Sequence, residues 1–230
     1  MAIAYGGSAI GNSGAGASTL TLSSFSISGS DTCLIVEVAN QGVNSVTSGV
    51  TCNGVAMTKI DQATVSITQN TSLWALYGAA SGNIVITRTT NFSDAIYASA
   101  TYYTGVGSST AITSLPKTKA TQPGTSYTAT VTTTVDNCWL VLGNYCNPTS
   151  PSAGSGTTRR TNNVISFIFD SNGPITPAGS ASLNVTGANA AANGYVMVAL
   201  EPVVAATSHI KSADGILYAN IKSADGVANS

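Results

Sequence analysis

Very few side chains in this sequence could perform acid–base or nucleophilic chemistry. The single histidine is His209, and a nucleophile needs a base beside it that a third group orients. His209 opens an 11-residue repeat, and Asn220 holds the same place in the second copy. We therefore interpret His209 as a variable repeat position and not as a general base.

Paired carboxylates are the other arrangement that could support catalysis, as in glycoside hydrolysis. The candidates outside the repeats are Asp31, Glu37, Asp61, Asp94, Asp136, Asp170 and Glu201. Asp31 and Asp136 stand at expected turns before strands, where an aspartate side chain caps the backbone. We expect no catalytic residue and no enzymatic activity.

Metal ligands and reactive thiols are equally scarce. The cysteines Cys33, Cys52, Cys138 and Cys146 form no Cys-x-x-Cys pair, and one histidine cannot complete a typical zinc site. Cys33 and Cys138 lie in apolar segments, where a buried free thiol behaves as a small hydrophobic residue. We expect buried thiols, with one structural disulfide as the alternative, and neither a metal nor another cofactor.

Aromatic rings with asparagine and aspartate nearby could form a platform for sugar stacking. Trp74 and Trp139 are the candidates for glycan stacking, and the alternative is that both rings lie in the core. Trp74 follows Leu73 in an alternating segment. Neighbouring side chains of a strand point to opposite faces, so one of these two should face outwards.

The composition excludes several classes of partner. Charged residues make up 7% of the chain and the net charge is −1, against about 25% charged residues in typical globular proteins. Such a surface lacks the cationic density that phosphates require, so we expect no nucleic-acid partner. It also gives little repulsion between copies, which favours close packing of subunits. No apolar run reaches the length of about 20 residues that predicts a membrane span.

The elements that must position these residues are all expected to be strands. Apolar and β-branched segments alternate with turn residues, and no helical period is present. Strands are expected near 31–40, 72–77, 84–89, 95–104, 127–135, 138–146, 164–169, 181–185 and 195–200. Asn53-Gly54 predicts a tight hairpin, because both residues accept a positive φ. The pattern predicts an all-β fold, an antiparallel β-sandwich of jelly-roll type.

We divide the chain into an N-terminal arm (1–18), a β-sandwich body (19–202) and a linker with two 11-residue repeats (203–230). The arm is rich in glycine and serine, and we expect it to be flexible or to dock elsewhere. Within the body, residues 31–36 and 136–141 look alike. We interpret them as matching core strands in the two halves of one sandwich and not as a duplicated domain.

The C-terminal tail repeats itself, with Ile-Lys-Ser-Ala-Asp-Gly at 210–215 and again at 221–226. Two copies this short cannot bury a core alone, so they must lie on the body, on another subunit or on a partner. Each Asp-Gly pair predicts a tight turn. We therefore predict assembly contacts at Ile210, Lys211, Asp214, Gly215, Ile221, Lys222, Asp225 and Gly226.

A series of short patterns runs through the body: Asp-Thr-Cys-Leu-Ile-Val-Glu-Val (31–38), Val-Thr-Cys-Asn-Gly-Val-Ala-Met-Thr (50–58), Leu-Trp-Ala-Leu-Tyr (73–77) and Ala-Thr-Tyr-Tyr-Thr-Gly-Val (100–106). In these patterns the chain resembles a β-sandwich module of phage and bacterial surface proteins. The tail is similar to Asn-Ile-Lys-x-x-Asp-Gly-Val-Ala repeats that follow such modules in phage structural proteins. The resemblance implies a virion or surface role and carries over no ligand-binding residue.

These features predict a non-enzymatic structural protein of a bacteriophage virion, such as a head decoration, a fibre or a tail appendage. The expected partners are other virion proteins and further copies of the chain, with a trimer as the first guess. Met1–Ser8 shows no secretory signal peptide, and a virion protein released by lysis needs none. The alternatives are a carbohydrate-binding or receptor-binding adhesive module that meets a host-surface glycan, and an extracellular filament subunit at the cell surface.

Overall fold

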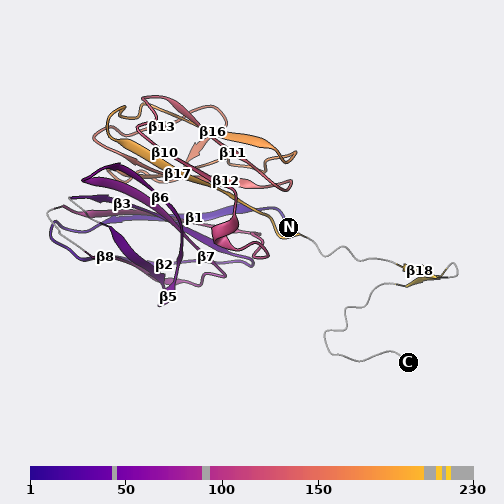
Figure 1. Ribbon diagram of the computed structural model, residues 1–230. Helices are drawn as coiled ribbons and strands as arrows, with labels where there is room; N and C mark the ends of the chain where they lie inside the picture. Colours follow the sequence, from indigo (N-terminus) through magenta and orange to yellow (C-terminus); the bar gives the residue numbers. More distant parts are fainter. Residues whose placement is uncertain (43–45, 90–93, 205–210, 214–215, 219–230) are drawn as a thin grey trace.

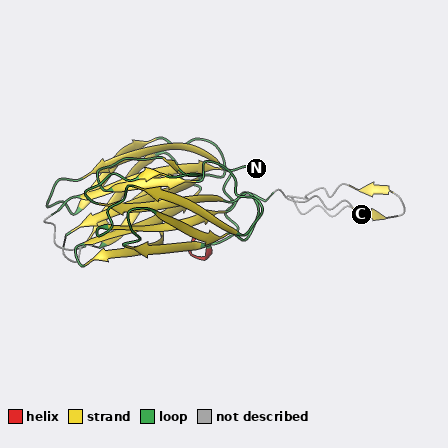
Figure 2. Cartoon of the chain, turned by 90° about the horizontal axis from the view of Figure 1, so that it is seen from above, coloured by secondary structure: helices red, strands yellow, loops and turns green. Residues whose placement is uncertain are grey.

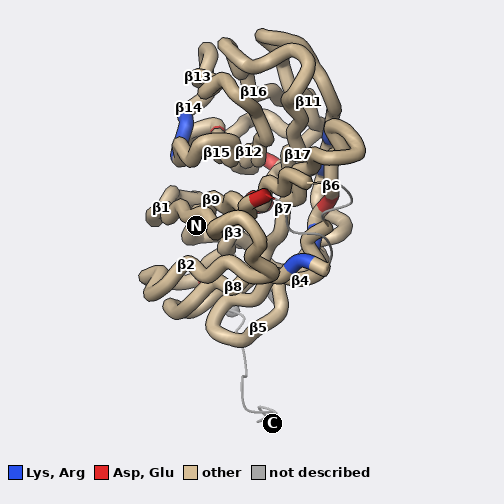
Figure 3. Tube along the Cα trace, turned by 90° about the vertical axis from the view of Figure 1, so that its left-hand side faces the viewer, with Lys and Arg blue, Asp and Glu red and all other residues tan. Residues whose placement is uncertain are grey.

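The computed structural model describes residues 1–230 except 43–45, 90–93, 205–210, 214–215 and 219–230 (Figure 1). In this part of the chain nearly all regular structure is antiparallel β-strand, apart from one short 3-10 helix, η1 (Ile112–Ser114) (Figure 2). The predicted all-β, sandwich-like fold is confirmed. The body is a stack of four sheets lying face to face (Figure 3).

The first two sheets form one sandwich. The first outer sheet has the order β2 (Thr19–Phe25), β8 (Gly82–Arg88), β4 (Thr47–Cys52) and β5 (Val55–Ala56). The first inner sheet has the order β1 (Ala4–Asn12), β9 (Ile96–Thr104), β3 (Cys33–Gln41), β7 (Gln69–Tyr77) and β6 (Thr58–Ser66). Between them lies the first core, to which alternate residues of β3, such as Leu34 and Val36, contribute.

The other two sheets form a second sandwich. The second inner sheet has the order β10 (Lys117–Thr121), β17 (Asn193–Leu200), β12 (Trp139–Cys146), β15 (Ser166–Asp170) and β14 (Thr158–Arg159). The second outer sheet has the order β11 (Tyr127–Thr132), β16 (Ser180–Thr186) and β13 (Ser152–Ala153). The second core between them includes Leu140 and Leu142 of β12.

A third apolar layer, the central core, joins the two sandwiches through their inner sheets. It combines Ile35 of β3 and Leu73 of β7 with Val141 of β12 and Val198 of β17. The inner sheets are therefore covered on both faces. This explains why every residue of β12 and all but the last residue of β3 are buried, and why these strands read as continuous apolar runs.

The two sandwiches share one strand order. In the inner sheets β1, β9, β3, β7 and β6 correspond to β10, β17, β12, β15 and β14, and in the outer sheets β2, β8 and β4 correspond to β11, β16 and β13. Our interpretation of a single, unduplicated sandwich is corrected by this topology: the same antiparallel unit occurs twice. The repeat is hard to see in sequence because a strand constrains only which face is apolar.

The structure also corrects the alignment of the two similar segments. A residue with positive φ precedes each central strand, Asp31 (φ 51°) before β3 and Asn137 (φ 62°) before β12. Aligning these two places Leu34 on Leu140, each in the core of its own sandwich. The sequence instead suggested that Cys33 matches Cys138, which is an alignment shifted by one residue. Such a shift would match side chains that point to opposite faces of their sheets.

The Asn53-Gly54 turn and the N-terminal arm were both predicted from the sequence, and the structure describes both. Asn53 (φ 49°) and Gly54 (φ 79°) connect β4 to β5 as the expected hairpin turn. The N-terminal arm differs from expectation, because Ala4–Asn12 forms β1 and pairs with β9 from Ala4↔Thr104 to Asn12↔Tyr97. The glycines there do not prevent strand formation, since the backbone of β9 supplies the hydrogen bonds and the sheet supplies the packing.

In the tail, β18 (Lys211–Ala213) pairs antiparallel with β19 (Ile216–Tyr218) in a sheet of their own. Of the eight predicted assembly residues, Lys211 lies in β18. The others lie outside the described residues: Ile210, Asp214, Gly215, Ile221, Lys222, Asp225 and Gly226.

Candidate functional site

The two tryptophans selected for glycan stacking are core residues. Trp74 and Trp139 are each only 6% exposed. Trp74 lies in the first core and donates its indole N–H to Ser72 Oγ at 2.9 Å. Trp139 lies in the central core with its ring centroid 5.9 Å from that of Tyr103. Neither ring offers a face to a sugar, so the structure favours the core alternative for both.

The cysteines and carboxylates do not gather into a reactive centre in the described part of the chain. All four cysteines are buried free thiols, so the disulfide alternative is wrong. Burial raises the pKa of the Cys33 thiol to about 12. No group of three or more His, Cys, Asp or Glu that could hold a metal ion occurs among the described residues. These residues also contain no helix long and apolar enough to cross a membrane.

The most unusual group is a carboxyl in the middle of the stack. Alternation along β3 points Glu37 to the same side as Cys33 and Ile35, towards the second sandwich. The residue is 0% exposed. On the opposite strand stands Gly143 of β12, where an added Cβ would lie 2.7 Å from Glu37 Cγ and 2.7 Å from Leu73 Cδ1. Because Gly143 has no side chain, the Glu37 side chain can occupy the space beside its backbone.

Hydroxyl groups surround this carboxyl from both sandwiches. Thr71 Oγ1 of β7 donates to Glu37 Oε1 at 2.6 Å, and Ser166 Oγ of β15 makes a hydrogen bond with Glu37 Oε2. Ser166 Oγ also lies 2.9 Å from Ser99 Oγ of β9. Burial raises the pKa of Glu37 to about 8, although the hydrogen bonds with Ser166 and Thr71 lower it. We call these four residues the Glu37 cluster.

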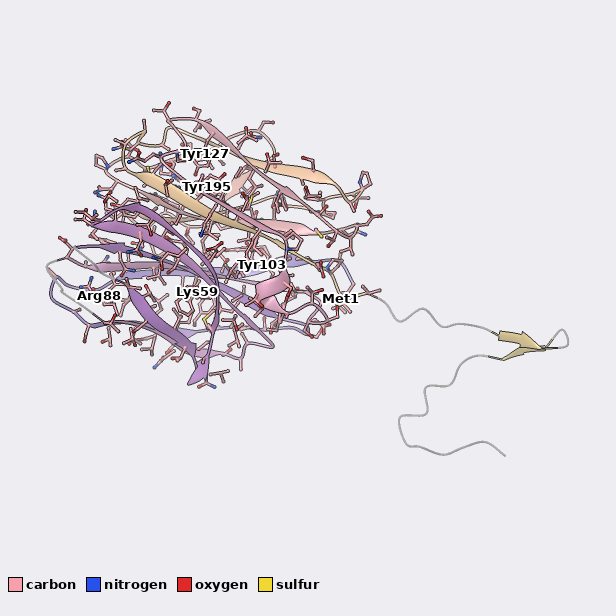
Figure 4. All side chains as sticks on the ribbon, viewed as in Figure 1. Met1, Lys59, Arg88, Tyr103, Tyr127 and Tyr195 are labelled. Carbon is pink, nitrogen blue, oxygen red and sulfur yellow. The ribbon has the colours of Figure 1, made fainter. Side chains whose placement is uncertain are left out.

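A second polar cluster joins the same two inner sheets at the side where β1 lies. Tyr103 Oη of β9 donates to Asp170 Oδ2 at 3.0 Å, and Arg160 Nε binds the same oxygen at 2.6 Å. The Arg160 guanidinium stands 4.2 Å from the ring centroid of Tyr5 on β1. Burial, and next the charge of Asp170, raises the pKa of Tyr103 well above its usual value. Figure 4 shows Tyr103 between the two sandwiches.

One exposed ion pair also joins the two sandwiches. Lys119 Nζ of β10 lies 2.7 Å from Asp61 Oδ1 of β6. Because the lysine is half exposed, this pair adds no more than about 1 kcal/mol. The sandwiches are therefore held by the central core, by the two polar clusters and by further hydrogen bonds such as those that Asn163 Nδ2 donates to Gly11 O and Ala98 O, and not by surface charge.

The two ends of the body's backbone meet at one place. Met1 donates its terminal N–H to Val203 O at 3.2 Å, and Val106 forms an isolated bridge with Pro202. A shallow cavity of about 420 Å³ lies here, lined by Met1, Ala2, Asp136, Asn137, Pro202, Val203 and Val204. In Figures 1 and 2 the N-terminus lies at this end of the stack.

No protein-family model, curated protein or solved structure matches this chain. What the site can do must therefore be argued from its geometry. The Glu37 carboxyl is enclosed on all sides, so no substrate can reach it. The arrangement suits holding two sandwiches together and does not suit turning over a ligand. Sequence reasoning named Glu37 only as a carboxylate; its position in an otherwise apolar run was the signal that it is buried.

Proposed function

We propose that this chain is a non-enzymatic structural protein of a bacteriophage virion, with the double sandwich displayed and the chain ends serving for attachment. The observation that carries the proposal is the meeting of Met1 and Val203 at one end of the stack. Any chain that precedes Met1 or follows Val204 leaves from that end. The opposite end of the body is then free to point outwards.

The body suits such a passive role. Its surface is built mainly from hydroxyl, amide and small side chains, since charged residues make up 7% of the chain. Four stacked sheets with three apolar layers give a stiff spacer. The virion assignment itself rests on the resemblance in sequence patterns and on the repeat tail.

The mass of the protein in solution tests the role of the tail. Light scattering should show a discrete oligomer for the full chain and a folded monomer for a chain that ends at Ser208. A matched control keeps the length of the tail and replaces both Asp-Gly pairs, at 214–215 and 225–226, with Ser-Ser. If the full chain and both variants have the same number of subunits per particle, the tail does not drive assembly and this part of the proposal fails.

A filament subunit is the second candidate, and β1 favours it. This strand is an edge of the first inner sheet over nine residues, Ala4–Asn12, without charge or proline. Uncharged edge strands are templates for pairing with another chain. Fibres formed by the purified protein alone would favour this candidate over a displayed module.

A further inference from the structure

We propose that the Glu37 cluster is a proton-dependent latch: the protonated carboxyl holds the two sandwiches together, and its ionisation releases the contact between them. The latch does not depend on the proposed virion role. The only carboxyl in the cluster comes from β3 of the first sandwich, whereas one of its partners, Ser166, comes from β15 of the second. The contact therefore spans the joint between the two.

The hydrogen-bond geometry indicates where the proton sits. Ser99 Oγ donates to the carbonyl oxygen of Ser166 at 3.0 Å, which uses the one hydroxyl proton of Ser99. Ser166 Oγ faces two acceptors, Glu37 Oε2 and Ser99 Oγ, but carries one hydroxyl proton. With an ionised carboxyl, one of these two contacts therefore has no proton. A protonated Glu37 supplies the missing proton, because Ser166 can then donate to Ser99 and accept from the carboxyl.

Among the residues that the structure describes, no cation forms an ion pair or hydrogen bond with Glu37. The groups that face it are Thr71 and Leu73 of β7, Ser99 of β9, Gly143 of β12 and Ser166 of β15, and none of these is charged. The partly buried cation at the joint, Arg160, is already paired with Asp170, which also accepts from Tyr103. A negative charge at Glu37 is left with hydroxyl groups alone in an apolar layer, and solvation through separation of the sheets becomes favourable.

The direction of the pH effect follows from linkage. In the closed joint the pKa of Glu37 is about 8, against 4.5 for the ordinary carboxyl that an open joint would expose. Below pH 4.5 both states hold the proton and pH has no effect. Between these values only the closed joint holds it, so the ratio of open to closed joints should rise about tenfold per pH unit. Above pH 8 the ratio levels off.

The cysteines are built-in reporters for the test, because they lie in different layers. Cys33 lies in the central core, Cys52 in the first core, and Cys138 and Cys146 in the second core. The full chain is treated with a maleimide at pH 5 to 8.5, and each site is quantified by peptide mapping. Each rate is divided by the rate of the same thiol in the denatured chain at the same pH. This division removes the pH dependence of the thiols themselves.

The latch predicts that the normalised rate of Cys33 rises about tenfold per pH unit up to pH 8 and exceeds the normalised rates of Cys52, Cys138 and Cys146, which opening of the joint leaves covered. In Glu37→Gln, which keeps the shape of the side chain, the rate of Cys33 should not depend on pH. If the four thiols share one normalised rate at each pH, they are exposed by unfolding of the whole protein and the latch is wrong. A flat profile for Cys33 in the parent protein, or an unchanged rise in Glu37→Gln, also overturns it.

Discussion

At the scale of single residues, Glu37 and Gly143 make one of the close contacts between the sandwiches. A methyl group at position 143 would approach two side-chain carbons at 2.7 Å. We expect Gly143→Ala to lower the free energy of unfolding by about 1–3 kcal/mol, the usual effect of overpacking a close-packed interior. Urea unfolding followed by circular dichroism measures the difference.

The control for this substitution is Gly173→Ala. An added Cβ at Gly173 meets no atom within 4 Å, and the φ of this residue is not in the left-handed region. The free energy of unfolding should therefore stay within about 1 kcal/mol of that of the parent. We expect a small increase, because alanine has fewer conformations than glycine in the unfolded chain. Equal losses at both positions would show that loss of glycine flexibility, and not the contact with Glu37, is responsible.

The same carboxyl should make stability depend on pH. Burial raises the pKa of Glu37 from 4.5 to about 8. Between these values the unfolded chain has lost the proton that the folded chain keeps, so the free energy of unfolding falls as the pH rises, by about 1.4 kcal/mol per pH unit. Glu37→Gln should remove this slope. Urea unfolding of both proteins at pH 5, 6, 7 and 8 gives the comparison, and parallel profiles would contradict the expectation.

At the scale of elements, β1 is the longest uncharged edge strand of the described body, ahead of β2 with seven residues and β11 with six. The edge strand β10 carries Lys117 and Lys119, and β13 and β14 are only two residues long. By contrast β1 has nine uncharged residues, with Ile10 50% exposed. Charge and shortness are the means by which natural sheets prevent edge-to-edge pairing.

We therefore expect Ile10→Lys to reduce association of the protein at high concentration while leaving the unfolding midpoint nearly unchanged. Sedimentation velocity over a concentration series measures the association. Ile67→Lys is the matched control, because Ile67 is 80% exposed in the turn between β6 and β7 and belongs to no strand edge. If both substitutions reduce association equally, added charge and not the β1 edge is the cause.

Elements also show what could be predicted from sequence. The central strands were found because covered strands read as continuous apolar runs. The strand β1 was missed because Gly6, Gly7 and Gly11 hide its alternation, although Gly6 and Gly11 are required where Tyr102 and Leu22 occupy the space of a Cβ. The Glu37 cluster joins residues from 37 to 166, and no local pattern brings together positions so far apart in the chain.

At the scale of the whole molecule, the central core should make the two sandwiches unfold together near pH 6. Trp74 reports on the first core and Trp139 on the central core. Fluorescence of Trp139→Phe and Trp74→Phe, each with one tryptophan left, should give urea transitions that coincide with circular dichroism of the same variant. If the fluorescence of Trp139 in Trp74→Phe changes at a lower urea concentration than circular dichroism, the two sandwiches separate before either one unfolds, which would contradict the expectation.

The shared strand order has a consequence for how the central joint came to be asymmetric. With Asp31 aligned on Asn137, Glu37 aligns with Gly143. The two residues that touch across the joint therefore occupy equivalent positions in the two sandwiches. Two identical separate units would have to place glutamate against glutamate or glycine against glycine, which means repulsion between like charges or an empty hole. Covalent fusion frees each half to carry its own residue. In the fused chain a large side chain, Glu37, can face a glycine, Gly143, at the equivalent position of the other half. Two identical separate chains related by symmetry cannot carry different residues at that position.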